Sequence, residues 1–103
     1  MSITITDKTF ASETNEGLVL IDFFGTWCAP CRALLPVLEK IEEELVEKLK
    51  IVKIDVDKNP ELAQSFGVLA VPTLVLQKDN EVLKRVTGLH SKSVLLDWIG
   101  EHI

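Results

Sequence analysis

Several kinds of residue are scarce in this chain, and each scarcity excludes a class of protein. Its 103 residues contain two cysteines, too few for the disulfide framework of a small secreted domain or for a tetrahedral structural zinc site. Eleven basic residues against sixteen acidic ones give a formal charge of −5, which excludes binding to nucleic acid through phosphate neutralisation. The longest apolar run, residues 18–24, is interrupted by Asp22, whereas a membrane-spanning helix needs about 20 apolar residues. We therefore expect neither a nucleic acid nor a membrane as a partner.

The remaining composition is that of a small folded protein. It is 47% hydrophobic and 26% charged over 103 residues, which predicts one folded domain over residues 1–103 rather than a disordered chain. The opening residues MSITITDKTF have no basic segment followed by an apolar stretch, so they do not form a secretory signal. We expect a cytoplasmic protein, although a signal removed before residue 1 would leave the same sequence.

Apolar spacing and turn residues predict alternating strands and helices. The expected strands are residues 2–6, 18–24, 51–56, 73–77 and 81–87; the expected helices are residues 7–14, with Asp7 as N-cap, 30–49, 60–66 and a last one that follows the cap Ser91. Pro36 predicts a kink in the long helix. Strands that alternate with helices pair in parallel through right-handed crossovers, and the final hairpin adds an antiparallel pair. The order therefore predicts an α/β fold with a mixed five-stranded sheet and helices on both faces.

The strand expected at residues 18–24 is apolar on both faces, which is typical of a central strand covered by helices above and below. Asp22 lies on one of these faces, between Leu20 and Phe24. A carboxylate on a buried face is costly to ionise, so we expect the pKa of Asp22 to be raised. The alternative is an aspartate at a solvated strand end.

The two cysteines, Cys28 and Cys31, lie where this central strand ends and the long helix begins. The unpaired N–H groups and the positive dipole end at the start of a helix stabilise a thiolate. Cys28, at the outer end, is expected to be exposed, and Cys31, one turn into the helix, to be more buried. Pro30 holds a helical φ between them.

Three other interpretations of the cysteine pair remain open. A structural disulfide of this spacing closes so short a loop that it contributes only about 2 kcal/mol. A zinc site would need His90 and His102, and neither has ligand spacing to the pair, so only a site shared by two chains would serve. Two inert buried thiols are not expected at a strand–helix junction. Redox chemistry is the favoured interpretation.

Several short motifs, each occurring once, follow one another along almost the whole chain. They are Asp22-Phe23, the Trp-Cys-Ala-Pro-Cys segment at 27–31, Pro36, the segment Lys-Ile-Asp-Val-Asp at 53–57, Phe66-Gly67-Val68, Val71-Pro72-Thr73 and Gly88. In these motifs the chain resembles the thioredoxin family. The resemblance implies the thioredoxin fold, with strand order 1-3-2-4-5 and four helices.

The resemblance also implies a function. The protein would be a thiol–disulfide oxidoreductase that reduces disulfides in client proteins, with Cys28 as nucleophile and Cys31 as resolving cysteine. It would bind no cofactor and no metal, and its redox-active group would be the Cys28–Cys31 disulfide. Electrons would come from NADPH through a separate flavoprotein, thioredoxin reductase. Its partners would be that reductase and disulfide-containing clients, and we expect a monomer.

The same resemblance assigns further residues to the site. Asp22 would be the buried proton acceptor for Cys31, and Lys53 would lie close enough to tune its charge, the alternative for Lys53 being a solvated strand position. Pro72 would be cis, and the backbone of Val71 would be free to pair with an extended client peptide. The residues expected to bind the client are Trp27, Ala29, Pro30, Val71, Pro72 and Gly88.

The chain departs from the family pattern at four places. Ala29 stands where glycine is usual, Phe24 where many members have tryptophan, Arg32 where lysine is commoner, and Leu69-Ala70 where Arg-Gly or similar is common. The position of Ala29 is one that tunes the redox potential in this family. Two alternative functions remain: an oxidase or isomerase of the same fold, and a binding module that uses the groove within a larger complex.

Overall fold

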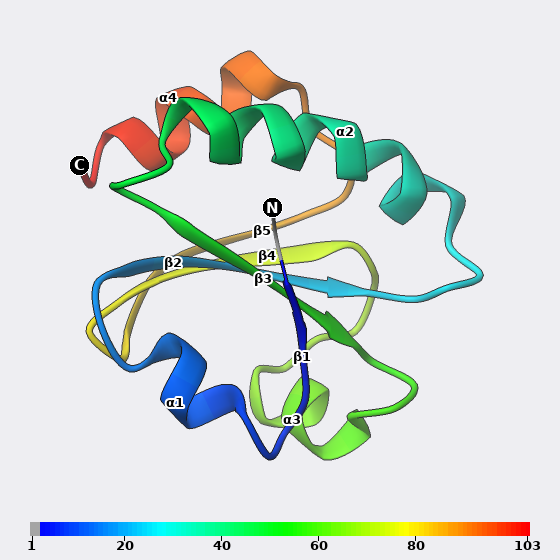
Figure 1. The fold of residues 1–103 in the computed structure, drawn as a ribbon. Coiled ribbons are helices and arrows are strands. Elements are labelled where there is room, and N and C mark those ends of the chain that lie inside the picture. Colours follow the sequence, from blue (N-terminus) through cyan, green and yellow to red (C-terminus); the bar gives the residue numbers. More distant parts are fainter. Residues whose placement is uncertain (1–2) are drawn as a thin grey trace.

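A single mixed sheet lies at the centre of the computed structural model, which describes residues 3–103 (Figure 1). Its strands are β1 (Ile3–Ile5), β2 (Leu18–Phe24), β3 (Lys50–Asp55), β4 (Thr73–Lys78) and β5 (Glu81–Thr87). They are arranged in the order β1-β3-β2-β4-β5. The β1–β3 and β2–β3 pairs are parallel, and the β2–β4 and β4–β5 pairs are antiparallel. The predicted mixed sheet and its strand order are confirmed.

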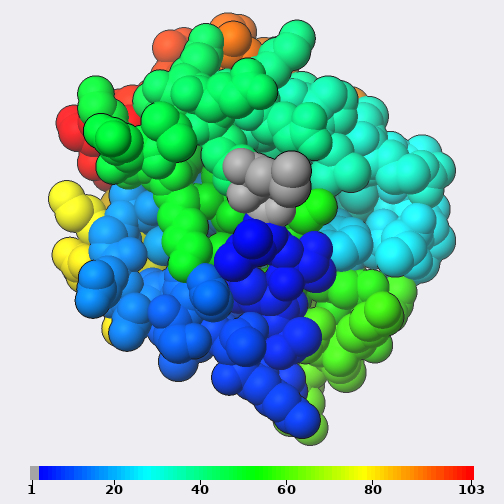
Figure 2. Space-filling view, viewed as in Figure 1, coloured from blue at the N-terminus to red at the C-terminus, as the bar shows by residue number. Residues whose placement is uncertain are grey.

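Four helices cover the two faces of the sheet. They are α1 (Phe10–Thr14), α2 (Ala29–Glu44), α3 (Pro60–Ser65) and α4 (Lys92–Gly100). In Figure 1, α2 and α4 lie on one face, which we call the α2 face, and α1 and α3 lie on the other, the α3 face. The space-filling view shows the same division, with α2 above the N-terminal strand and α3 below it (Figure 2). None of the helices in residues 3–103 is long and apolar enough to cross a membrane.

Some predicted boundaries differ from those in the structure. The first strand was expected from residue 2, which lies outside the described residues. Helix α1 follows Thr9 rather than Asp7: residues 7–9 form a turn, and the Asp7 backbone N–H donates to Asn59 Oδ1 at 3.0 Å. Helix α2 ends at Glu44, not at Leu49. A turn at residues 45–48 replaces the last helical turn. Leu49 is still buried in the core of the α2 face, and its N–H bonds to the carbonyl oxygen of Leu45.

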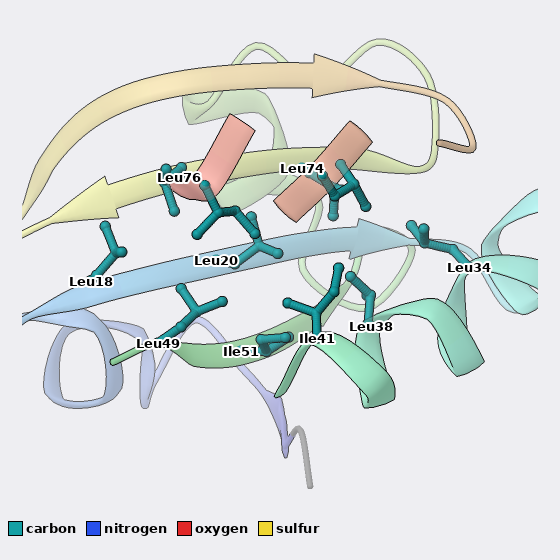
Figure 3. Packing of buried hydrophobic residues seen from close by; sticks show 11 residues of the cluster. Leu18, Leu20, Leu34, Leu38, Ile41, Leu49, Ile51, Leu74 and Leu76 are labelled. Atoms are coloured by element: carbon teal, nitrogen blue, oxygen red, sulfur yellow. The ribbon is translucent and has the colours of Figure 1, made fainter. Parts of the chain in front are cut away.

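Central strand β2 contributes side chains to both hydrophobic cores. On the α2 face, Leu20 packs against Leu38 and Ile41 of α2, as Figure 3 shows. On the α3 face, Phe23 packs in a second cluster against Phe66, and the centroids of the two rings are 5.3 Å apart. The alternation predicted for this strand is therefore confirmed. Two packed cores hold the carboxyl end of β2, where the cysteines follow, in a fixed place.

Candidate redox site

Cys28 is the N-cap residue of helix α2, directly beyond strand β2. Its backbone is extended, with φ −92° and ψ 110°, and its Sγ accepts the backbone N–H of Cys31 at 3.2 Å. The two cysteines are joined by a disulfide, with their Cα atoms 5.2 Å apart, a normal separation for such a bond. Ala29 and Pro30 form the exposed first turn of the helix between them. The sulfur of Cys28 thus lies at the positive end of α2, with a backbone N–H group directed at it.

Both cysteines are largely covered, which corrects one prediction. Cys28 is 5% exposed and Cys31 3%, whereas Cys28 was expected to be exposed. The loop that precedes β4 covers it: the Val71 carbonyl oxygen lies 3.7 Å from Cys28 Sγ. Trp27 is 65% exposed beside the pair. The exposed side of the site is therefore formed by Trp27 and the first turn of α2, and the Val71 loop forms the opposite wall.

The Val71–Pro72 peptide bond is cis, as expected. The Pro72 carbonyl oxygen accepts the backbone N–H of Gly88 at 2.8 Å, and Gly88 has a φ of +99° that a residue with a side chain rarely adopts. The Thr73 hydroxyl donates to the Ala70 carbonyl oxygen at 2.6 Å. These bonds bring Val71, Pro72 and Gly88 together next to Cys28.

Asp22 is completely buried, on the face of β2 that faces α2. Neither of its carboxylate oxygens has a hydrogen-bond partner among residues 3–103. Removal from water raises the pKa of Asp22 from 3.8 to about 7, and the charge of Lys53 opposes part of that rise. The alternative of a solvated strand end is wrong, and the expected rise in pKa is confirmed.

Lys53 is the direct neighbour of Asp22 on strand β3. It is half-buried, and its Nζ lies 5.9 Å from the centre of the Phe24 ring. A hollow of about 240 Å³ is lined by Lys53 and Cys31 together with Phe24, Leu35 and Arg32, among others. The structure thus places Lys53 beside the buried carboxylate and on the same hollow as the second cysteine.

Two residues of the site were not found by the sequence reasoning. The indole N–H of Trp27 donates to Asp57 Oδ2 at 2.7 Å. A Cβ at Gly25 would lie 2.7 Å from the Trp27 ring, so only glycine leaves room for the indole. One signal for Asp57 was present: it closely follows β3, and the carboxyl ends of parallel strands meet at the same edge of a sheet.

Cys28 caps helix α2, its disulfide partner follows one turn further, and a cis proline lies opposite. Asp22, whose pKa is raised, lies on the strand that leads to Cys28. These features define a site for dithiol–disulfide exchange. Within residues 3–103 no three His, Cys, Asp or Glu side chains gather as a metal-binding group. The chemistry of such a site resides in the two sulfur atoms.

Comparison with known proteins agrees with this class. The thioredoxin family model matches residues 1–101. A thioredoxin of Listeria monocytogenes is 54% identical over 99 residues, covering 96% of each chain. One from Bacillus subtilis is 46% identical over 101 residues, covering 98% of this chain and 97% of its own, and one from Rickettsia bellii is 39% identical over the full length of both.

The chain therefore belongs to the thioredoxin family. It is a thiol–disulfide oxidoreductase with a redox-active Cys28–Cys31 pair, and the family's reaction requires no bound cofactor. Its partners in general are a reductase and disulfide-containing client proteins.

Proposed function

We propose that residues 1–103 form one thioredoxin domain that reduces client disulfides through Cys28 as nucleophile. The observation that carries this proposal is the bond from the Cys31 backbone N–H to Cys28 Sγ at the start of α2. A donor aimed at this sulfur, at the positive end of the helix, stabilises the thiolate that attacks. The Cys28 thiolate forms a mixed disulfide with one client sulfur, and the other client sulfur leaves as a thiolate.

The second step is assigned to Cys31 and Asp22. The Asp22 carboxylate accepts the proton of Cys31, directly or through a water, and the Cys31 thiolate attacks Cys28 Sγ. The bond to the client breaks, the Cys28–Cys31 disulfide forms, and the client leaves with two more electrons than it brought. A carboxylate with a pKa of about 7 is well matched to accept a proton near neutral pH. Lys53, on the neighbouring strand, tunes that charge as a secondary residue.

The client-binding surface is proposed around the cysteines. An extended client segment pairs with the backbone of Val71, in the manner of strand addition, beside Pro72 and Gly88. Trp27, Ala29 and Pro30 provide contacts on the other side of the sulfur atoms. The exposure of Trp27 and of the first turn of α2 supports this assignment.

We propose that thioredoxin reductase, a flavoprotein, returns the Cys28–Cys31 disulfide to the dithiol with electrons from NADPH. The protein would act as a monomer in the cytoplasm, with no metal and no nucleic-acid or membrane partner. The family membership supports the recycling partner, and the net charge of −5 opposes a phosphate-driven partner.

The test is the reduction of insulin disulfides with NADPH and a thioredoxin reductase. Wild type is expected to turn over, and Cys28→Ser to be inactive. Cys31→Ser should make one attack and then accumulate a mixed disulfide, visible by mass spectrometry and released by dithiothreitol. Insulin reduction by Cys28→Ser would contradict the proposed order of attack.

Asp22→Asn tests the second step separately. Its resolution of the mixed disulfide should be slower and should lose the wild-type dependence on pH around 7. Resolution rates that match wild type across pH 6 to 9 would remove Asp22 from the mechanism.

A further inference from the structure

The loop between α3 and β4, residues 66–72, forms the wall of the site opposite helix α2. It places the Val71 carbonyl oxygen 3.7 Å from Cys28 Sγ and ends at the cis bond before Pro72. The loop has little packing of its own at its apex, where Leu69 is 99% exposed and Ala70 is exposed as well. Its position is therefore set away from the apex, by the packing of Phe66 and Val68 in the core of the α3 face and by hydrogen bonds at its two ends.

The end of the loop is held by neutral hydrogen bonds. The Thr73 hydroxyl donates to the Ala70 carbonyl oxygen, and the Gly88 N–H donates to the Pro72 carbonyl oxygen. The start of the loop is held by backbone bonds to α3, such as the one from the Val68 N–H to the Ala63 carbonyl oxygen at 3.0 Å, and in addition by a charged group from strand β5. Arg85 Nη1 donates to the Phe66 carbonyl oxygen at 2.6 Å, and Nη2 donates to the Gly67 carbonyl oxygen at 3.3 Å.

The position of Arg85 in the sheet explains this contact. Arg85 pairs with Val75 in the β4–β5 ladder, and Val75 packs in the core of the α3 face. Directly opposed residues of an antiparallel pair share a face, so Arg85 lies on the side of the sheet that carries α3. Its guanidinium can reach the end of that helix without crossing the sheet.

The end of α3 is a favourable place for a cation. Phe66 is the C-cap residue, and Gly67 follows with a φ of +67°. The last carbonyl oxygens of a helix lack helical partners and carry the negative end of its dipole. The planar guanidinium donates to two successive carbonyl oxygens at once, which a lysine amino group on a flexible stem does not reproduce.

We propose that Arg85 is a positioning residue that holds the α3–β4 loop in place for protein clients. It acts through the loop and touches no reacting atom. This inference rests on the proposed function, in which a client pairs with the Val71 backbone. A small soluble disulfide needs only the sulfur of Cys28, so its reaction does not depend on the loop, whereas a protein client does.

Single-turnover kinetics with pre-reduced protein test the proposal without involving the reductase. The probes are insulin and 5,5′-dithiobis(2-nitrobenzoate), a small disulfide. In Arg85→Met the half-saturating insulin concentration should rise about fivefold with the maximal rate unchanged, because ground-state positioning is lost while the chemical step is kept. The rate with the small disulfide should equal that of wild type. Arg85→Lys should lie between the two proteins.

Lys84→Met is the matched control. Lys84 is the preceding residue of β5, and its Nζ pairs with Glu101 at 2.9 Å instead of with the loop. This variant should leave both reactions unchanged. Amide hydrogen exchange at residues 68–71 should accelerate in Arg85→Met and not in Lys84→Met.

The outcomes separate the inference from the proposed function. If insulin and the small disulfide slow by the same factor in Arg85→Met, or if neither reaction changes, Arg85 does not position the loop for clients and the proposed function stands. If pre-reduced wild type leaves insulin intact, the proposed function itself fails, and this inference fails with it.

Discussion

Two buried polar side chains on neighbouring strands differ in their hydrogen bonding: one has a partner and the other has none among the described residues. Gln77 of β4 lies on the α3 face, near the start of β2, and its amide donates to the Thr14 carbonyl oxygen at 3.2 Å. Asp22 of β2 lies on the α2 face, near the carboxyl end of the same strand, and neither carboxylate oxygen has a partner among the described residues. Both side chains are almost completely removed from water.

The difference separates a buried polar group whose hydrogen bonding is satisfied within the fold from a buried carboxyl that is left to titrate. Buried polar groups are normally hydrogen-bonded, because an unpaired one costs free energy. Gln77 follows that rule and remains neutral at every pH. Asp22 breaks it, and the cost of its burial is what raises its pKa to about 7. The following variants test this contrast, from the largest expected effect to the smallest.

Asp22→Asn should stabilise the oxidised protein by about 4 kcal/mol at pH 8, because it removes a buried charge whose cost is expressed in the pKa rise from 3.8 to about 7. Below pH 3.8 the carboxyl is protonated in both the folded and the unfolded wild-type chain, so the gain should vanish there. The free energy of unfolding of wild type should fall as the pH rises from 3.8 to about 7 and then level off. Urea denaturation at pH 4 and pH 8 measures it, and an equal gain at both values would show that burial of charge is not the cause.

Gln77→Leu should destabilise the protein by about 1–3 kcal/mol, because the Thr14 carbonyl oxygen loses its buried donor. No ionisation is involved, so the loss should be the same at pH 4 and pH 8. The same urea titrations provide the measurement. A loss that depends on pH would remove the contrast with Asp22.

Lys53→Met should raise the pKa of Asp22 further, since the charge of Lys53 now lowers it. The effect should be smaller than that of desolvation, which is the larger cause of the shift. The pH at which resolution of the mixed disulfide reaches half its maximal rate should move upward. Lys50→Met, on the same strand but paired with Glu13, is the control, and an equal movement in both variants would argue against a local charge effect.

Asp57→Ala should have the smallest effect, about 1 kcal/mol or less of stability, because the bond it removes is exposed. The indole of Trp27 loses its acceptor, so the fluorescence of Trp27 should change while the unfolding midpoint moves little. Asp97→Ala, an exposed aspartate of α4, should change neither. Unchanged emission in Asp57→Ala would mean that the bond does not hold the indole in solution.

The fold was largely predictable because the decisive patterns are local. Apolar residues on both faces of β2 predict its central position, and the hairpin residues predict the antiparallel pair. The errors lie where a long-range contact decides. Asp7 is a good helix cap by type, but its N–H donates to Asn59, 52 residues away in the sequence, and the helix begins only after Thr9. Helix α2 ends at Glu44 because the backbone of its C-cap, Leu45, leaves the helical conformation, and the turn that follows still brings Leu49 into the core.

The same distinction between local patterns and long-range contacts applies to the site. The strand–helix junction and the buried face of Asp22 follow from residues that are close in sequence. The burial of Cys28 was not predictable from its own neighbours, because the cover comes from Val71, 43 residues further along the chain. The Trp27–Asp57 bond and the Arg85 contacts also join separate elements, so no local spacing indicates them.

The close approach of Gly25 to the Trp27 ring has an evolutionary consequence. A side chain at position 25 would displace the indole from Asp57, since a Cβ there lies 3.0 Å from the ring nitrogen that donates to this carboxylate. Substitutions at positions 25 and 57 therefore remove the same interaction, and their costs should not add. The two positions are epistatic, and their histories should be linked.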